Sequence, residues 1–182
     1  MTLFPVPGPE GIPPESQPRL ARIEAGQGRV LNLYKVMAIA PALLEGYVEL
    51  ARLFSTSSLT LQQQQVVLFA TNRFHGCAYC VAGHSAAALR YGVPDELVTQ
   101  MRDGAEIDDP KLEALRRFTL AVLQARGAVT TETMDEFVLA GHTPRQALEV
   151  IVGIAAKVLS NYANHFASTP LDPELETHAW KP

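Results

Sequence analysis

Apolar residues recur along most of the chain at three- and four-residue intervals, which is the spacing of one face of an α-helix. Glycine, proline and capping residues separate these segments, and few segments alternate apolar and polar residues as a strand does. The pattern therefore predicts an all-α fold. The expected helices cover residues 16–25, 32–40, 41 to the loop at Ser57, 61–74, 77–92, 94–104, 110–126, 131–138 and 144 to beyond Tyr162.

The last of these helices has the widest apolar face. Its members are Leu148, Ile151, Ile154, Ala155, Val158, Leu159 and Tyr162. A face of this width has to be buried, either in the core of its own chain or against a neighbouring subunit, and both arrangements stay open.

The first 18 residues differ in character, because they contain six prolines, at positions 5, 7, 9, 13, 14 and 18. Proline fixes φ and lacks a backbone donor, so we expect an extended arm without a helix or central strand. The arm is either a loosely ordered terminus or a segment laid across a partner subunit. The predicted organisation is thus an arm over residues 1–18 and a single helical domain over 19–182.

Composition places the chain among ordinary globular proteins. It has 182 residues, of which 47% are hydrophobic and 19% charged, and a formal net charge of −4. This balance excludes a disordered chain and gives no basic surface for nucleic acid or an anionic membrane. The apolar runs are too short to span a bilayer. Two cysteines cannot make a disulfide framework and the chain shows no signal peptide, so we expect a cytoplasmic protein.

Both cysteines lie in the stretch His75–His84, which reads HGCAYCVAGH. A helix that begins at Cys77 directs unpaired backbone N–H groups at this sulfur, so we expect the pKa of Cys77 to be lowered. Cys80 lies one turn later, close enough to form a disulfide with Cys77. The side chain of His84 leans back towards the N-terminus and is expected over the sulfur of Cys80.

Three interpretations of this stretch are possible. The cysteines can be structural, since a buried free cysteine behaves as a small hydrophobic residue. They can hold zinc together with His84 and a fourth ligand, His75 or His165, but a structural zinc site usually shows two local pairs of ligands. Redox chemistry of the C-x-x-C pair fits best, and it requires no metal or organic cofactor.

The sequence CAYCVAGH, preceded by Leu59-Thr60 and a helix, resembles the AhpD-like branch of the carboxymuconolactone decarboxylase family. The similarity extends over 32–34, 41–44 and 169–172, and thus over most of the chain after the arm. It implies an AhpD-like all-helical domain with the C-x-x-C at a helix N-terminus. Active members of this branch reduce alkyl hydroperoxides.

By this resemblance Cys80 attacks the peroxide, Cys77 resolves the sulfenic acid into a disulfide, and His84 belongs to a proton relay. The helix-terminus argument instead favours Cys77 as the more acidic thiol, and the two assignments disagree. Three polar residues, Asn161, Asn164 and His165, lie near the end of the last predicted helix, and we expect them in a buried hydrogen-bond cluster or a subunit contact.

The chain departs from the family pattern at two positions. The relay glutamate of the family stands twelve residues before the first cysteine, where this chain has Gln65. An amide can orient His84, and the helical hairpin brings the two to similar heights, but an amide cannot transfer a proton near neutral pH. Glu49 or Glu45 is the candidate for a substitute carboxylate. A second histidine of the best-known members is replaced by Tyr79, a possible weak acid.

These observations predict thiol-dependent reduction of hydroperoxides through a dithiol cycle of Cys77 and Cys80. The resemblance implies a dithiol reductant protein, lipoyl-bearing or thioredoxin-like, and a homo-oligomer, either a trimer or a hexamer. Two alternatives stay open: a lyase of the decarboxylase type acting on a small lactone acid, and a thiol redox sensor without enzymatic activity.

Overall fold

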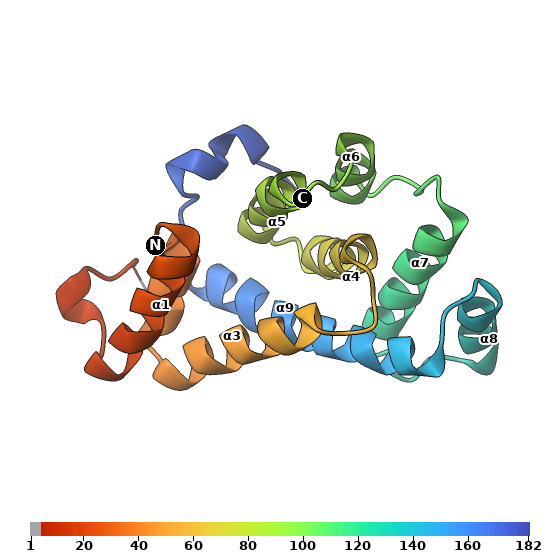
Figure 1. Cartoon of the computed structure of the whole chain (residues 1–182), viewed down its shortest axis with the longest axis horizontal. Helices are drawn as coiled ribbons and strands as arrows, with labels where there is room; N and C mark the ends of the chain where they lie inside the picture. The colour runs from red at the N-terminus through yellow and green to blue at the C-terminus, as the bar shows by residue number, and fades with distance from the viewer. Residues whose placement is uncertain (1–4) are drawn as a thin grey trace.

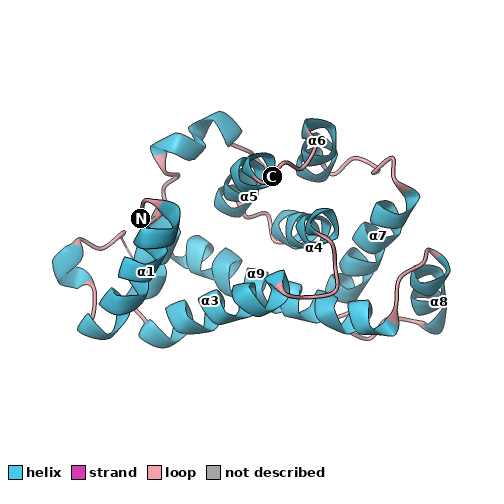
Figure 2. Ribbon diagram, in the orientation of Figure 1, coloured by secondary structure: helices cyan, strands magenta, loops and turns pink. Residues whose placement is uncertain are grey.

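The computed structural model describes residues 5–182, and over these residues every regular element is a helix (Figures 1 and 2). The expected all-α fold is therefore confirmed. The α-helices are α1 (Gln17–Gln27), α2 (Asn32–Ala38), α3 (Pro41–Ser55), α4 (Leu61–Phe74), α5 (Ala78–Arg90), α6 (Asp95–Asp103), α7 (Pro110–Gln124), α8 (Thr131–Leu139) and α9 (Pro144–Ala167). Three 3-10 helices are η1 (Pro9–Gly11), η2 (Pro14–Ser16) and η3 (Pro173–His178).

Capping residues explain why several helices begin where the sequence predicts. Thr60 precedes α4 and forms a capping box, in which its side chain accepts from the backbone of Gln63 and the Gln63 side chain accepts from the backbone of Thr60. Thr143 and Gln146 form the same arrangement before α9. Each box satisfies two backbone donors that have no partner within the helix, so the helix start is fixed locally.

The proline-rich arm is not extended throughout, and this expectation is wrong over η1 and η2. A proline at the first position of a short helix loses no hydrogen bond, because that N–H would be unpaired anyway. Ser16 is buried, and its hydroxyl donates to the carbonyl of Ala38 at 2.8 Å, which holds η2 against the domain. Residues 1–4 of the predicted arm lie outside the described residues.

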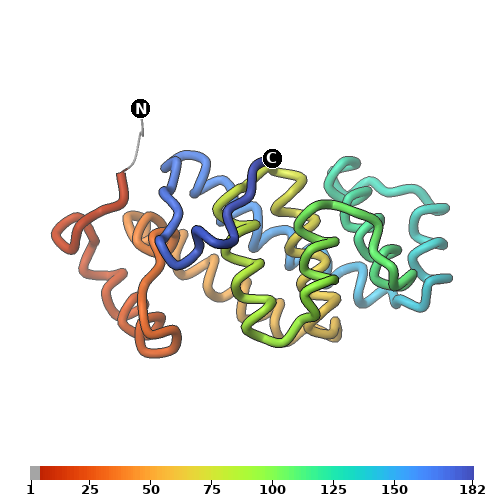
Figure 3. Tube along the Cα trace, turned by 90° about the horizontal axis from the view of Figure 1, so that it is seen from above, coloured from red at the N-terminus to blue at the C-terminus, as the bar shows by residue number. Residues whose placement is uncertain are grey.

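The helices assemble into an elongated body with α1 at one end and α8 at the other (Figure 3). The long helices α3 and α9 run side by side along one face, and α4 and α5 lie above them (Figure 1). One apolar cluster joins α4 to α6, α7 and α8. A second joins α1, α2, α3, α5 and η3, and it contains both cysteines.

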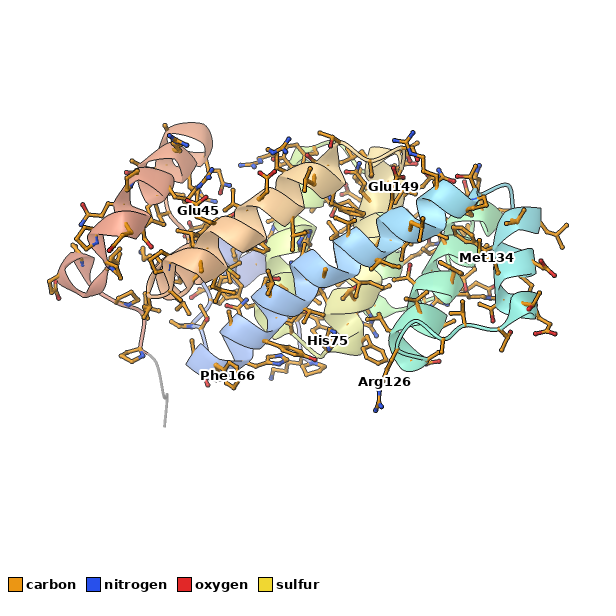
Figure 4. All side chains as sticks on the ribbon, turned by 90° about the horizontal axis from the view of Figure 1, so that it is seen from below. Glu45, His75, Arg126, Met134, Glu149 and Phe166 are labelled. Carbon is orange, nitrogen blue, oxygen red and sulfur yellow. The ribbon has the colours of Figure 1, made fainter. Side chains whose placement is uncertain are left out.

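The apolar face of α9 is only partly covered by its own chain (Figure 4). Ala147, Val150 and Gly153 are buried against α3 and α4, whereas Leu148 and Ile151 are 68% and 50% exposed. Of the two arrangements that the sequence leaves open, burial in the chain's own core is therefore not observed for Leu148, Ile151 and Tyr162. Among residues 5–182, no helix combines the length and the apolar character needed to cross a bilayer.

Gly153 sets how closely α9 approaches α3 and α4. A Cβ at this position would lie 2.7 Å from a ring carbon of Phe54 and 2.9 Å from a methyl of Val67. We expect Gly153→Ala to lower the free energy of unfolding by about 1–3 kcal/mol, because neither neighbour is free to move away in a packed core.

Urea unfolding followed by circular dichroism measures this effect. Gly46→Ala is the matched control, because Gly46 also lies within a helix but an added Cβ there meets nothing within 4 Å. The control is expected to raise stability by about 0.5–1 kcal/mol, since alanine favours the helix. Equal effects of the two substitutions would contradict the proposed close approach.

Candidate active site

Cys77 does not begin the helix as expected but caps it. Its backbone is extended (φ −82°, ψ 92°), so α5 starts at Ala78 and the sulfur turns back over the first turn. The backbone N–H of Cys80 donates to the Cys77 Sγ at 3.4 Å. Gly76 lies at the turn between α4 and α5 and has a φ of 64°, a left-handed conformation that a residue with a side chain rarely adopts. Both cysteines are free and buried.

Polar side chains from α9 surround the sulfur of Cys80. The amide of Asn164 donates to the Cys80 Sγ at 3.2 Å and lies 3.9 Å from the Cys77 Sγ. The Oγ of Ser160 lies 3.8 Å from the Cys80 Sγ. Asn161 donates to Asn72 on α4 at 2.9 Å. The expected buried hydrogen-bond cluster therefore forms with Asn161 and Asn164, and Asn164 brings it into contact with both sulfurs. His165 is exposed, so the expectation is wrong for this residue.

The two thiols differ in acidity in the opposite sense to the helix-terminus expectation. Burial opposes a charge on Cys80, but the hydrogen bond from Cys77, the positive charge of Lys157 and the amide of Asn164 outweigh it and lower the pKa of Cys80. The pKa of Cys77 is raised, first by its hydrogen bond to Cys80 and then by burial. The prediction of a lowered pKa for Cys77 is thus wrong, because the hydrogen bond to Cys80 and burial outweigh the backbone N–H group at the helix start.

His84 lies between Gln65 on α4 and Lys157 on α9. Its Nδ1 is 3.2 Å from the Oε1 of Gln65, and its Nε2 is 3.0 Å from the Nζ of Lys157. An amide oxygen only accepts and an ammonium only donates, so these partners assign the ring proton to Nδ1. Burial and then the charge of Lys157 lower the pKa of His84 well below its ordinary value, so the ring is neutral at pH 7.

The predicted contact between Gln65 and His84 is therefore present. The hydrogen-bond partners of the imidazole are Gln65 and Lys157, however, and not the sulfur of Cys80. His84 instead joins the cluster through its contact with Lys157.

Lys157 was missed in the sequence analysis, although it is only 2% exposed and lies at the centre of the cluster. Its ammonium also lies 5.9 Å from the centre of the Tyr47 ring. A signal for it exists in the sequence: Lys157, Ser160 or Asn161, and Asn164 recur at three- and four-residue spacing and form a polar stripe beside the apolar face of α9.

Tyr79 takes a structural position beside Cys80. Its hydroxyl donates to a carboxylate oxygen of Asp172 and accepts from the backbone N–H of Leu33 at 3.3 Å. Burial, followed by the hydrogen bond to Asp172, raises the pKa of Tyr79. The phenol thus ties α5 to α2 and to the segment before η3, and it is poorly suited to donate a proton to a substrate.

Glu49 and Glu45 lie outside this cluster within the chain. Both are exposed on α3, where Glu49 pairs with Arg52 at 2.6 Å and Glu45 pairs with Arg19 (Figure 4 labels Glu45). The expected substitute carboxylate is therefore not supplied by these two residues, because their side of α3 faces solvent. Among residues 5–182, no three side chains of His, Cys, Asp or Glu are grouped to hold a metal ion.

A pocket of about 240 Å³ leads to Cys80. Cys80, His84 and Lys157 line it together with four tyrosines, Tyr34, Tyr47, Tyr79 and Tyr91. Arg29 and Arg90 also contribute to its wall, and no Asp or Glu among the described residues does. Cys77 is not part of the wall, so a molecule in this pocket meets one sulfur, with the second directly behind it.

Comparison with known proteins finds a family model that matches part of the chain. Residues 41–120 match the model of the Carboxymuconolactone decarboxylase family, as the motif around the cysteines led us to expect. A search of curated proteins found no match.

Several solved structures share the fold. The alkylhydroperoxidase AhpD core of an uncharacterized peroxidase-related protein from Ralstonia eutropha JMP134 has a TM-score of 0.82 and 22% identity, covering 94% of this chain and 93% of that chain. A peroxidase-related protein from Silicibacter sp. TM1040 has a TM-score of 0.78 and 16% identity, covering 95% and 92%. A variant of the debrominase Bmp8 in complex with 2,3,4-tribromopyrrole has a TM-score of 0.79 and 18% identity, covering 98% and 96%. At these identities the likeness is one of fold.

The contact between Gln65 and His84 gives a direct test of the cluster. In Gln65→Glu a carboxylate faces the Nδ1–H of His84 and stabilises the imidazolium, so we expect the pKa of His84 to rise by about one unit or more. An NMR titration of the His84 ring measures the shift. Gln62→Glu is the control, because Gln62 is exposed in the first turn of the same helix and the substitution is identical. A rise of equal size in both variants, or in neither, contradicts the contact.

Proposed function

We propose that this chain, whose residues 41–120 belong to the carboxymuconolactone decarboxylase family, is an enzyme that reduces organic hydroperoxides with the dithiol of Cys77 and Cys80. The observation that carries the proposal is the position of Cys80. Its sulfur has a lowered pKa and lines the pocket, while Cys77 is within reach behind it. An acidic thiol in a pocket wall, beside a second thiol, is the arrangement that reversible oxidation requires.

In the first step the thiolate of Cys80 attacks the distal oxygen of the hydroperoxide ROOH. The S–O bond forms, the O–O bond breaks, and the alkoxide leaves and takes up a proton to become ROH. The sulfur is oxidised to sulfenic acid, and the peroxide is reduced.

In the second step the thiol of Cys77 attacks the sulfenic acid of Cys80. The disulfide forms and water leaves, with the thiol proton and the hydroxyl of the sulfenic acid as its parts. The hydrogen bond to Cys80 is the first cause of the raised pKa of Cys77. The negative charge of Cys80 is lost when this sulfur becomes a sulfenic acid, so Cys77 gains thiolate character at the step in which it attacks. An external dithiol, lipoyl-bearing or thioredoxin-like, then exchanges with the disulfide and restores both thiols.

The surrounding residues position this pair. His84, held by Gln65, belongs to the path of the proton, and Tyr79 fixes the first turn of α5 through Asp172. Glu49 has no part in this proposal, since it pairs with Arg52 at the surface.

We further propose that the chain works as a homo-oligomer, a trimer or a hexamer, in a reducing compartment such as the cytoplasm. The exposed apolar residues of α9, among them Leu148 and Phe166, support an assembly that covers this helix.

The two alternative functions differ from this proposal in their use of the dithiol. A lyase of the decarboxylase type has no use for a dithiol. A redox sensor would be oxidised once per dithiol, whereas an enzyme continues to react for as long as reductant is present.

A second candidate reaction is the reductive removal of a halogen from a small aromatic ring. The four tyrosines of the pocket favour an aromatic guest, and the fold is shared with a debrominase bound to a brominated pyrrole. The same dithiol would supply the electrons: an aryl bromide and two thiols give the arene, hydrogen bromide and the disulfide.

Thiol titration before and after one equivalent of cumene hydroperoxide tests the proposed function. We expect both thiols to be lost as an intramolecular disulfide, and a sulfenic acid to be trapped on Cys80 in Cys77→Ser. Cys80→Ser is the control and is expected to react at least tenfold more slowly, because Cys77 is buried and is not part of the pocket wall. Survival of both thiols in the unmodified protein contradicts the peroxidase proposal.

Bromide release separates the second candidate from the first. The protein is incubated with dithiothreitol and 2,3,4-tribromopyrrole, and bromide is measured by ion chromatography. Release that needs both cysteines supports dehalogenation, and the Cys77→Ser and Cys80→Ser variants provide the control. Release at the rate of dithiothreitol alone excludes it.

A further inference from the structure

We infer that Lys157 is the counter-ion of the Cys80 thiolate and the acid that protonates the departing alkoxide. In this chain it takes the place of the carboxylate relay that the family pattern has at the position of Gln65. The acid role rests on the proposed reduction of hydroperoxides, whereas the counter-ion role concerns the resting protein.

The first argument is the burial of the lysine charge. Lys157 is 2% exposed, and its one hydrogen-bond partner among residues 5–182 is the neutral Nε2 of His84 at 3.0 Å. No salt bridge within the described part of the chain includes it. An ammonium in a protein interior is costly without an opposite charge nearby, so a counter-ion is needed.

The candidates for this counter-ion are the charged and titratable groups that face the region of Lys157 from each neighbouring element. Tyr47 of α3 and Tyr34 of α2 stay protonated, because burial raises the pKa of each, to about 12 for Tyr34. Gln65 of α4 and the amides of α9 carry no charge. Asp172 is engaged by the hydroxyl of Tyr79 and the backbone of Asn32.

On the α5 side lie the two cysteines, His84 and Arg90, and the cation of Arg90 supplies no negative charge. His84 is a base whose pKa is lowered, so it supplies no negative charge, and the pKa of Cys77 is raised. The thiolate of Cys80 is therefore the counter-ion. It lines the same pocket as Lys157, and Asn164 supplies a hydrogen bond to its sulfur.

The second argument is the direction of the hydrogen bonds around His84. Gln65 accepts the Nδ1–H, so the lone pair of Nε2 is left to accept a proton of Lys157. This contact holds the ammonium at the pocket wall, while its remaining N–H groups stay free for a guest. His84 and Gln65 are therefore positioning residues for Lys157.

The third argument is charge balance during the reaction. Thiolate, hydroperoxide and lysine ammonium become sulfenic acid, alcohol and neutral lysine amine, so the proton of the alcohol comes from Lys157. The ion pair of Cys80 and Lys157 is present before the step, and both of its members are neutral after it. When an external dithiol later reduces the disulfide, the proton of the regenerated Cys80 thiol returns to the amine and restores the ion pair.

Alkylation of Cys80 by iodoacetamide tests the counter-ion role without any peroxide. All variants carry Cys77→Ser, so that a single thiol reacts, and the rate is measured from pH 4 to pH 10. We expect Lys157→Met to raise the midpoint of the profile by about one unit or more, and Lys157→Arg to keep it within a few tenths. Lys111→Met, at an exposed lysine of α7, is the matched control and is expected to leave the midpoint unchanged.

Single-turnover oxidation of the same proteins by cumene hydroperoxide tests the acid role. It is measured at a pH above each midpoint, where the thiolate is fully formed. Arginine keeps the charge but does not release a proton, so we expect both Lys157→Arg and Lys157→Met to react at least tenfold more slowly than the protein with Lys157. Thermal unfolding verifies that each variant is folded.

The outcomes separate this inference from the proposed function. An unchanged alkylation midpoint in folded Lys157→Met overturns the counter-ion role, and unchanged oxidation rates overturn the acid role. A shifted midpoint in a protein whose Cys80 does not react with the hydroperoxide supports the counter-ion and refutes the peroxidase proposal alone.

Discussion

The hydrogen bond from Lys157 to His84 joins the long helix α9 to the hairpin of α4 and α5, and most properties of the site depend on it. It places a positive charge in a pocket that contains no acid among the described residues. It also fixes which nitrogen of His84 carries the proton, since Gln65 occupies the other side of the ring. Together with the hydrogen bond from Cys77, this lysine, which is distant in the sequence, lowers the pKa of Cys80.

This dependence explains why the structure needs a close contact between helices. At Gly153, one turn before Lys157, the absence of a side chain lets α9 approach Phe54 and Val67 directly. A wider separation would move the ammonium away from His84. The packing of the core and the electrostatics of the pocket are thus two results of the same helix contact.

The sequence predicts the helices well because their ends are local events. Thr60, Pro41 and Gly76 act through hydrogen bonds and torsion angles within a few residues of themselves. The contact between Gln65 and His84 is predictable for a similar reason, because the two residues lie at similar distances from the turn of a helical hairpin.

The acidity of the cysteines was not predictable in that way. The helix start at Cys77 is visible in the sequence, but the amide of Asn164 and the charge of Lys157 reach Cys80 only through the tertiary fold. Tyr79 was considered for its acidity, yet its partner Asp172 is 93 residues away and turns it into a structural link. Contacts between distant segments determine the acidity of Cys80 and the role of Tyr79, and the spacing of residues along one helix does not reveal such contacts.

The position of Cys77 behind Cys80 has a consequence for kinetics. Since the pocket leads to one sulfur, an oxidising substrate and a reducing thiol must use the same entrance and leave before the other can enter. Such a site follows ping-pong kinetics, in which each of the two reactants at high concentration competes with the other for the free enzyme form it cannot use. In the proposed dithiol cycle, the steady-state fraction of the cysteine pair held as the disulfide is therefore set by the ratio of oxidant to reductant around the protein.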